Sequence, residues 1–584
     1  MAKIGIVGET YQETSLPFNA QRSINLYPVM DQTGKEVAAM YGTPGLLLFG
    51  NMGTGAIRAD FSCANGRAFA VSGSTLYEVA SDGTGTSRGS LNQSSGIVYM
   101  AENGLQLAIC DGTSLYIFTY ATNIFKQIIG GLNYATNGTF TTDTAWTKGT
   151  GWTISGGVAV ATGAISVAID QTSTLTLVAG VSYVVQYTMT VSAGSLTASI
   201  GGTAGITRTG AGTYVETIVC GATQDIAFTG AGFTGTLDNV TISDPAVGLP
   251  ASVGCVWFID SYFMVSQNGT RHFNISSPND GTKWAALDFA SKESSPDSLK
   301  KGTQAVGQVW LQGDKTSEIW SNTGAASFPF ARITGAKIEV GIYAPATAIA
   351  VDNSMLWVGS SKEGNGIVYR AQGFFPLRIS TTPIEVMIRA ATDPTNIRAY
   401  TYQRDGHLFY VLTGGGLATS LVYDITTKMW HERAWLNSQG QFETHLGTCC
   451  MSAFGSIIVG DKNNGNLYLL DENTYTDNGG ILAAERVYTT LSDEDKRMRY
   501  NRLVIGVENG VGLQSGQGSA PTIELQLSKD GARTWSDIFT SGIGAVGKYM
   551  TKVVFRRLGI AEQITFKIRI TDPVKRVIVG SYLT

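Results

Sequence analysis

The residue types that most often carry chemistry are few and scattered in this sequence. Its four histidines, His272, His407, His431 and His445, have no i,i+4 partner and no HExxH motif, so they form no recognisable metal site. The six cysteines form no CxxC pair, and buried free thiols are the expected state for them. No Walker loop or GxSxG motif is present. We therefore expect no metal, no cofactor and no catalytic residues.

A short segment near the C-terminus, SKDGARTWSD, looks like an Asp-box, with Ser528, Asp530, Gly531, Thr534 and Trp535 in place. In such a hairpin the aspartate accepts hydrogen bonds from turn amides and the tryptophan packs beneath. The motif is frequent in sialidase propellers, which raises a glycosidase hypothesis. A sialidase also needs three arginines for the substrate carboxylate and a Tyr/Glu nucleophile pair, and no such set is visible. We expect the box to be structural and the protein not to be an enzyme.

One charged segment, LSDEDKRMRYNR from Leu491 to Arg502, places Lys496, Arg497 and Arg499 directly after acidic residues. It could contact DNA or a neighbouring subunit. The adjacent carboxylates favour a solvated or intersubunit salt-bridge segment instead.

The composition indicates a folded, turn-rich β protein. Glycine accounts for 71 of 584 residues without a G-X-Y period, only 14 are proline, and 24 tyrosines and 23 phenylalanines are present. Charged residues make up 15%, against about 25% in a typical soluble protein. A net charge of -4 argues against a surface that grips nucleic acid, although a mildly acidic wall could line a DNA passage. No apolar run approaches the roughly 20 residues needed to span a membrane.

One pattern recurs along the chain: a short apolar strand, a polar turn, a second strand ending in small residues, and an aromatic strand. The copies begin at Ala56, Gly96, Ser252, Thr303, Ala346, Asn396 and Gly447. Their spacing of about 40 to 50 residues, with one large gap, is typical of propeller blades. The repeat predicts an all-β protein with a β-propeller of six or seven blades.

The gap, residues 131–246, is rich in Thr, Gly, Ala and Val, and its strong alternation predicts about eight short strands in an inserted β-sandwich. Its ends, NGTFTTDTAWTKGTGWTISGG and FTGTLDNVTI, resemble jelly-roll domains of the carbohydrate-binding-module type. In that family sugars stack on exposed aromatic rings, and the candidates here are Trp146, Trp152 and Tyr183. The alternative is that both tryptophans are core residues at the end of the sandwich.

The N-terminal segment SLPFNAQRSINLYPVMDQTGKEVAAMYGTPGLLLF resembles the opening of the packaged-DNA stabilisation protein family, the tail hub or nozzle of short-tailed phages. The matching residues are Gln21, Arg22, Asn25, Leu26, Tyr27, Pro28, Tyr41, Gly42, Thr43, Pro44 and Gly45. The blade repeats extend this similarity over most of the chain outside the insert.

The resemblance implies a structural virion protein in the phage tail, assembled in the host cytoplasm. Its subunits would form a ring, expected to be a hexamer, below the portal-adaptor protein. The ring would continue the DNA channel, close it to retain packaged DNA, and bind a tail needle or plug and tailspikes or tail fibres. Viral DNA would pass through without specific recognition. A host-binding adhesin that uses the insert as a glycan receptor is the alternative function.

These patterns together predict five regions. They are an extended N-terminal arm (1–50), the first part of the propeller (51–130), the inserted jelly-roll sandwich (131–246), the second part of the propeller (247–484) and a C-terminal β region (485–584). The arm is expected to contact a neighbouring subunit or the adaptor. The alternative is that it supplies the propeller's closing strand and part of its outer wall.

Overall fold

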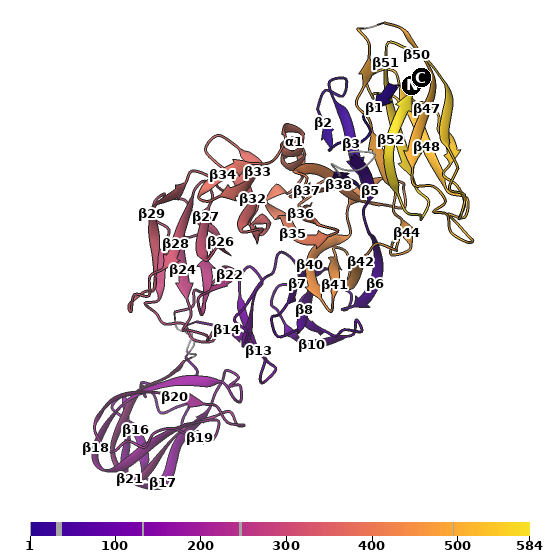
Figure 1. The fold of residues 1–584 in the computed structure, drawn as a ribbon. Coiled ribbons are helices and arrows are strands. Elements are labelled where there is room, and N and C mark those ends of the chain that lie inside the picture. Colours follow the sequence, from indigo (N-terminus) through magenta and orange to yellow (C-terminus); the bar gives the residue numbers. More distant parts are fainter. Residues whose placement is uncertain (1, 31–37, 131–132, 244–247, 495) are drawn as a thin grey trace. The chain divides into compact units, whose positions relative to one another are not determined.

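The structure, a computed structural model, is built almost entirely of β-strands (Figure 1). It describes residues 2–30, 38–130, 133–243, 248–494 and 496–584, so the predicted boundaries at 131, 246 and 247 lie outside the described residues. Within that part, the helices are α1 (Thr382–Ala390) and the 3₁₀ turns η1 (Pro345–Thr347) and η2 (Pro394–Asn396). None of its helices is long and apolar enough to cross a membrane.

The chain forms two compact units. The first contains Met1–Met100, Lys292–Ala325 and Pro329–Thr584, and the second contains Ala101–Ser291 and Ala326–Phe328. Each unit holds several small antiparallel sheets of the blade type, which fits the predicted propeller.

Five blade sheets belong to the first unit. Their strands are β7 (Ile57–Ser62), β8 (Ala68–Ser72), β9 (Thr75–Val79) and β10 (Gly85–Ser90); β26 (Leu299–Ala305), β27 (Gln308–Gly313), β28 (Ser317–Asn322) and β29 (Phe330–Ile338); β30 (Gly341–Ile342), β31 (Ile349–Val351), β32 (Ser354–Ser360), β33 (Asn365–Gln372) and β34 (Phe375–Arg378); β35 (Ile397–Arg404), β36 (His407–Gly414), β37 (Ser420–Asp424) and β38 (Met429–Leu436), with β39 (Phe442–Thr444) beside it; and β40 (Gly447–Ala453), β41 (Ser456–Asp461) and β42 (Asn466–Asp471).

Two more blade sheets belong to the second unit, the first of them beginning at the boundary between the units. Their strands are β11 (Tyr99–Glu102), β12 (Gln106–Cys110), β13 (Leu115–Thr119) and β14 (Ile124–Ile128), then β22 (Val253–Ile259), β23 (Tyr262–Gln267), β24 (His272–Ile275) and β25 (Phe289–Ser291). The described residues therefore contain seven blade sheets, one for each copy of the sequence repeat.

A repeated turn explains why these segments fold into similar sheets. In one blade the Asp111 carboxylate accepts hydrogen bonds from the amides of Thr113 (3.1 Å) and Ser114 (2.8 Å) and from the Tyr116 hydroxyl (3.0 Å). In another, the Asp461 carboxylate accepts hydrogen bonds from the Tyr468 hydroxyl at 2.6 Å and from the Asn463 amide at 2.7 Å. Each aspartate ends a buried strand, and its carboxylate fixes both the turn and the aromatic strand that follows.

The last blade is completed by a strand from the other end of the chain. β6 (Gly45–Asn51) pairs antiparallel with β42, with Leu47 opposite Leu469 and Gly45 opposite Asp471. The short strands β43 (Thr476–Asp477) and β44 (Gly480–Ile481) extend the same sheet. The N-terminal segment thus supplies the fourth strand of this blade, which was the alternative reading of the arm.

The C-terminal region forms a two-sheet sandwich together with part of the arm. One sheet contains β4 (Leu26–Met30), β5 (Ala38–Gly42), β52 (Val577–Leu583), β47 (Met498–Val507), β50 (Val553–Ala561) and β1 (Ala2–Ile4). The other contains β45 (Ala484–Val487), β46 (Leu491–Ser492), β51 (Gln563–Ile570), β48 (Thr522–Ser528) and β49 (Phe539–Gly542). Their shared core includes Leu26 and Met40 from the arm beside Phe555 and Ile568. The arm is therefore not a free extended segment.

The insert, within the second unit, is one seven-stranded sheet bent around its own core. Its strands are β15 (Thr147–Lys148), β16 (Trp152–Ser155), β17 (Val158–Thr172), β18 (Ser182–Ile200), β19 (Thr203–Ala204), β20 (Gly212–Val219) and β21 (Asp225–Ser243). Three of these are long strands rather than the expected short ones. They bend where Gly163, Gly194 and Gly232 have positive φ, and a Cβ on Gly194 would lie 2.2 Å from the Gly232 carbonyl oxygen.

Strand β6 packs so closely against its neighbour that position 50 requires glycine. A Cβ on Gly50 of β6 would lie 2.0 Å from the carbonyl oxygen of Gly83, so Gly50→Ala must displace backbone. We expect it to lower the free energy of unfolding by about 1–3 kcal/mol, measured by urea denaturation. Gly5→Ala is the control, because nothing lies within 4 Å of its Cβ. Equal stability of the two variants would contradict the tight packing of β6.

Candidate functional site: the junction made by the N-terminal arm

Strand β3 (Ala20–Ile24) brings together the residues that the N-terminal motif singled out. It lies between β38 of a blade and β45 of the sandwich, parallel to the first and antiparallel to the second. These pairings join a blade and a sandwich sheet into one continuous sheet of twelve strands. Figure 1 shows β3 beside β38. β2 (Tyr11–Gln12) pairs with the first two residues of β3, Ala20 and Gln21.

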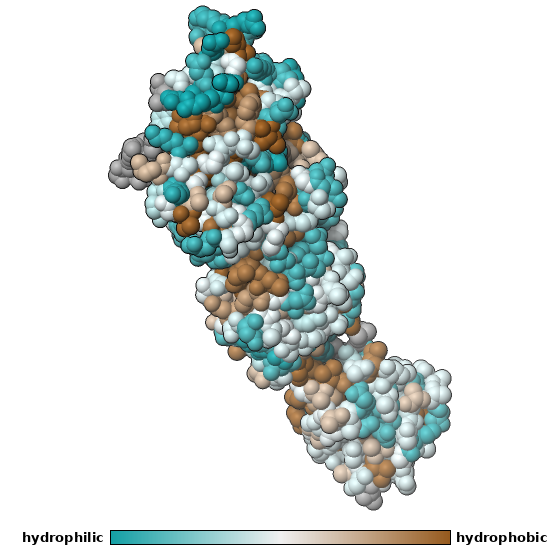
Figure 2. All heavy atoms as spheres, turned by 90° about the vertical axis from the view of Figure 1, so that its right-hand side faces the viewer, coloured by the Kyte–Doolittle hydropathy of each residue, from teal (hydrophilic) through white to brown (hydrophobic). Residues whose placement is uncertain are grey.

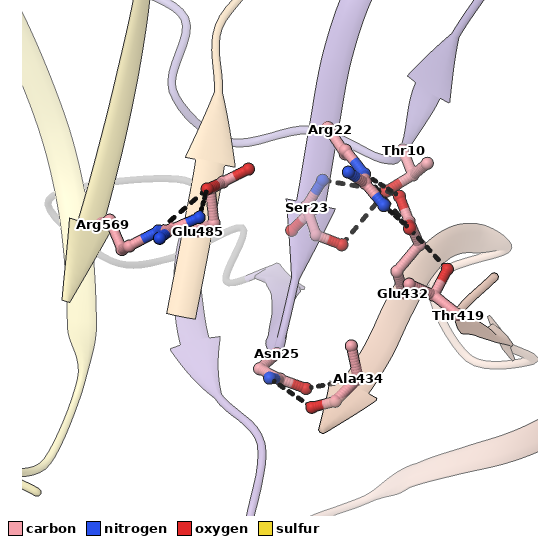
Figure 3. Close-up of polar contacts among 9 residues, drawn as sticks. All are labelled: Thr10, Arg22, Ser23, Asn25, Thr419, Glu432, Ala434, Glu485 and Arg569. Carbon is pink, nitrogen blue, oxygen red and sulfur yellow. Dashed lines mark hydrogen bonds and ion pairs between the residues drawn. The ribbon is translucent and has the colours of Figure 1, made fainter. Parts of the chain in front are cut away.

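A bidentate ion pair fixes β3 to the blade. The Arg22 guanidinium donates to both carboxylate oxygens of Glu432, from Nε at 2.9 Å and from Nη2 at 2.7 Å (Figure 3). The Glu432 side chain is fully buried, and the hydroxyls of Thr419 (2.7 Å) and Thr10 (3.5 Å) also donate to it. A buried carboxylate with this many donors stabilises the junction, and loss of its cation leaves an unpaired charge.

Asn25 follows β3 and holds the next turn. Its φ of 54° is in the left-handed region, which asparagine tolerates better than most residues. The side-chain amide donates to the carbonyls of Ala434 and Ala483, both at 2.8 Å, and its oxygen accepts from the Ala434 amide at 2.9 Å (Figure 3). One side chain therefore connects the end of β38 to the start of β45.

A second buried arginine holds the arm from the sandwich side. Arg486 on β45 is fully buried and donates to the carbonyls of Ile6 (2.8 Å), Glu9 (3.1 Å) and Arg22 (3.3 Å), and to the Gln21 side chain (2.8 Å). Burial lowers the pKa of Arg486 to about 10, so it remains charged at neutral pH. It satisfies four acceptors of the arm at once.

These partners were missed by the sequence analysis, although a signal for them exists. Both strands that flank β3 contain a Glu-Arg dipeptide within an otherwise apolar run, WHERAW on β38 and AAERVY on β45. Glu485 in the second dipeptide accepts from Arg569 on β51 at 2.7 Å. Charged pairs inside buried strands indicate internal partners, because an unpaired buried charge is costly.

The remaining motif residues turn the chain from the sandwich into β6. Tyr27 and Tyr41 are opposite each other on β4 and β5, and Pro28 is paired to Met40. The Gly42 amide donates to the Arg576 carbonyl at 2.8 Å.

At the end of this turn hydrogen bonds hold the chain, and Gly45 has no room for a side chain. The Pro44 carbonyl accepts from Arg433 at 2.7 Å. A Cβ on Gly45 would lie 2.3 Å from the Thr474 carbonyl oxygen, and the Thr43 amide donates to the Asn25 carbonyl at 3.1 Å. These motif residues therefore make contacts within the first unit, although the Tyr41 side chain is exposed.

The aromatic residues proposed for glycan binding lie in the core of the insert. Trp146 is 6% exposed, Trp152 4% and Tyr183 0%. Both indole N–H groups donate to backbone carbonyls, and the Tyr183 hydroxyl accepts from the Val178 amide at 3.0 Å. A ring buried in this way cannot stack on a sugar. The prediction of a stacking platform is corrected here to the alternative, in which these residues form the core.

The Asp-box residues form a hairpin turn between β48 and β49. The Asp530 carboxylate accepts from the amides of Arg533 (3.1 Å) and Thr534 (3.0 Å) and from the hydroxyls of Ser528 and Thr534, both at 2.6 Å. The hydrogen bonds from the Ser528 and Thr534 side chains hold the pKa of Asp530 below its usual range. Gly531 adopts a positive φ, and Trp535 packs against the core at Ala20. All five residues serve the turn.

A cavity of about 530 Å³ in the first unit is lined by the first strands of several blades. Among the described residues that line it, Asp60 provides the one carboxylate, with Arg58, Arg398, Cys449 and Cys450 nearby. Glycosidases place two carboxyl groups about the scissile bond, so this lining does not form such a pair. Burial raises the pKa of the Asp60 carboxyl to about 8. No group of three His, Cys, Asp or Glu side chains within the described ranges could hold a metal ion.

Family models match nearly the whole chain. The model described as bacteriophage P22 Gp10, β-propeller, matches residues 2–173 and 168–475, and the model described as bacteriophage P22 Gp10, β-sandwich, matches residues 484–584. No curated protein sequence matches this chain.

Three solved structures that are similar to this chain have low TM-scores. The N-terminal domain of Nup159 has 8% identity, covers 74% of this chain and 95% of its own, and has a TM-score of 0.34. An exo-β-1,3-galactanase from Phanerochaete chrysosporium has 9% identity, with coverages of 57% and 82% and a TM-score of 0.20. The extracellular domain of BT3049 from B. thetaiotaomicron has 13% identity, with coverages of 93% and 76% and a TM-score of 0.27. No inference rests on these likenesses.

The Arg22–Glu432 pair predicts a strong coupling energy. Arg22→Met leaves a buried carboxylate without its cation, and we expect a loss of about 3–5 kcal/mol in the free energy of unfolding. The double variant Arg22→Met/Glu432→Leu should recover most of this loss, because it removes the unpaired charge as well. Denaturant titrations of the two single variants and the double variant measure the cycle. Simple additivity of the single effects would contradict the proposed pairing.

The Asp60 carboxyl predicts a pH-dependent stability. Its pKa is about 8 in the folded protein and near the ordinary 3.8 in the unfolded chain, so the folded state binds more protons between these values. The Asp60 contribution to stability therefore falls as the pH rises from about 4 to about 8. Asp60→Asn removes this titration, and its stability relative to the natural protein should increase with pH over that window. Denaturation midpoints of both proteins across this window measure the difference, and a constant difference would contradict the assignment.

Proposed function

The chain belongs to the family of bacteriophage P22 Gp10, and from this premise we propose that it is a tail hub or nozzle subunit that assembles as a ring below the portal-adaptor. As a family member it is a structural phage protein that stabilises packaged DNA and a component of the virion. The finer proposal is a hexameric ring that continues the DNA channel, closes it, and anchors a needle or plug and tailspikes or fibres.

The observation that carries this proposal is the extent of the family match. It reaches from residue 2 to residue 584 apart from a short stretch before the sandwich, and it includes both the propeller and the sandwich. Because both domains match in one chain, the match supports a common role of the whole protein and not only a common fold.

The junction supports a mechanical role within such a particle. A hub must resist force from packaged DNA without separating its parts. Here one sheet continues from a blade into the sandwich through β3, and two buried arginines hold the arm in place. β3 pairs with β38 at one residue and with β45 at three, so the side-chain hydrogen bonds of Arg22 and Arg486 reinforce a short backbone contact.

Assembly with the adaptor tests the proposal. The purified chain is mixed with portal-adaptor complexes of the same phage, and the products are measured by light scattering and electron microscopy. We expect a complex that carries a closed ring of this chain, since two different faces of each subunit would meet head to tail. A chain that stays monomeric and forms no complex would overturn the proposal.

The insert provides a matched variant for the same experiment. Asn133 and Ser243 form a bridge, so the two ends of the insert lie side by side and a short linker can replace the segment between them. The insert also has a core of its own. If the variant without the insert still assembles, the propeller and the sandwich are sufficient to form the ring, as we expect. If this variant alone fails to assemble, the insert is needed for the ring and this expectation is wrong.

A further inference from the structure

Charge is distributed unevenly along this chain. Residues 485–584 carry 15 Lys and Arg against 10 Asp and Glu, whereas the remaining 484 residues carry 26 against 35. The slightly negative net charge of the chain is therefore the sum of a positive charge on residues 485–584 and a negative charge on the other residues. Figure 2 shows hydrophilic residues beside apolar ones on the surface of the sandwich, at the top of the view.

Four basic residues lie on the strand pair β47 and β50 of one sandwich sheet, and Lys552 directly precedes β50. β47 and β50 are antiparallel neighbours, and their inward residues, such as Leu503 and Phe555, are in the core. Since strand side chains alternate between faces, the residues between them point outward. We call Arg499, Arg502, Lys552, Arg556 and Arg557 the basic face. All are exposed except Arg502, which is half-buried.

A β-bulge adds one arginine to this face. The register between β47 and β50 shifts between Tyr500 and Arg502, which inserts an extra residue into β50. Arg557 at this point has a φ of 61°, and Arg556 and Arg557 are both exposed although they are neighbours in the chain. A left-handed arginine is uncommon and strained, and bulges often re-aim side chains at functional places.

Like charges lie close together on the basic face. Arg502 and Arg556 are directly opposite each other on neighbouring strands, where like charges destabilise a sheet. Arg499, Arg556 and Arg557 have no carboxylate within ion-pair distance in the described part of the chain. The carboxylates near the strand ends have other partners: Glu562 is 3.9 Å from Arg497, and Glu508 is 3.0 Å from Lys575. An anion on the face would relieve the repulsion.

We propose that the basic face binds the phosphate backbone of duplex DNA. Arginine suits this ligand because its planar guanidinium matches phosphate oxygens and is weakly hydrated. Such contacts carry no sequence information, so the binding would be non-specific and dependent on salt. The proposal rests on the proposed function, which brings packaged DNA to this protein, and it assigns the contact to the sandwich.

The experiment measures binding of the full chain to a fluorescently labelled duplex of random sequence, by anisotropy, across about 50 to 200 mM salt. Four arginine contacts would give a slope of log K against log salt of about -3 to -4. Arg556→Gln/Arg557→Gln should reduce the size of this slope by about 2 and weaken binding by about 10- to 60-fold near 0.1 M salt. The matched control, Lys362→Gln/Arg533→Gln, removes the same charge from exposed positions off this face and should bind like the natural protein.

Arg557→Gly separates binding from folding. Glycine accepts the positive φ, so this variant should be at least as stable as the natural protein in thermal unfolding while it binds DNA more weakly.

No saturable DNA binding at low salt, or equal binding by the Arg556/Arg557 variant and the natural protein, would overturn the proposal. So would self-association at low salt that the same variant abolishes without any DNA binding, because the face would then contact a second copy. Ring assembly with the adaptor is measured separately, so failure of this site and failure of the hub role are distinguishable.

Discussion

A single strand with two hydrogen-bonding edges determines how the first unit is built. β3 contacts a blade on one edge and the sandwich on the other, and neither contact is long. Side-chain hydrogen bonds therefore stabilise the junction in addition to the backbone pairing. Arg22 binds the buried Glu432 on one side, and Arg486 binds arm carbonyls on the other. These partners are far apart in sequence, so the junction joins segments from both ends of the chain.

Some of this organisation could be predicted from the sequence and some could not. The blades are visible because each repeats a local turn, such as the one around Asp111, within a few residues. The arm motif was also found, but its partners were not, since Glu432 is 410 residues from Arg22 and no local pattern connects them. Trp146 and Trp152 were candidates for sugar stacking with the core as the alternative, because alternation alone does not say which face is the core. Their burial places both in the core. The alternation suggested about eight short strands in the insert, but three of its strands are long and bend at glycines.

The net charge did not indicate how charge is distributed over the surface. A net charge of -4 argued against contact with nucleic acid, and it remains true that most of the chain is acidic. Folding gathers arginines from β47 and β50 on one face, with Arg502 opposite Arg556 across the pair and Arg557 turned outward by a bulge. Electrostatic binding depends on such local fields rather than on the total. A protein that stabilises packaged DNA can therefore be acidic overall and still carry a surface suited to phosphate.

Native-state hydrogen exchange of the full chain tests the central claim most directly, that the arm is an integral part joining a blade to the sandwich. Peptides that cover residues 18–30, 428–436 and 483–488 report on β3 and its two neighbours. The structure predicts that all three exchange slowly and open together, with the protection of a shared cooperative unit. Rapid exchange over residues 18–30, with the other two peptides still protected, would show an arm that detaches freely and would contradict the account.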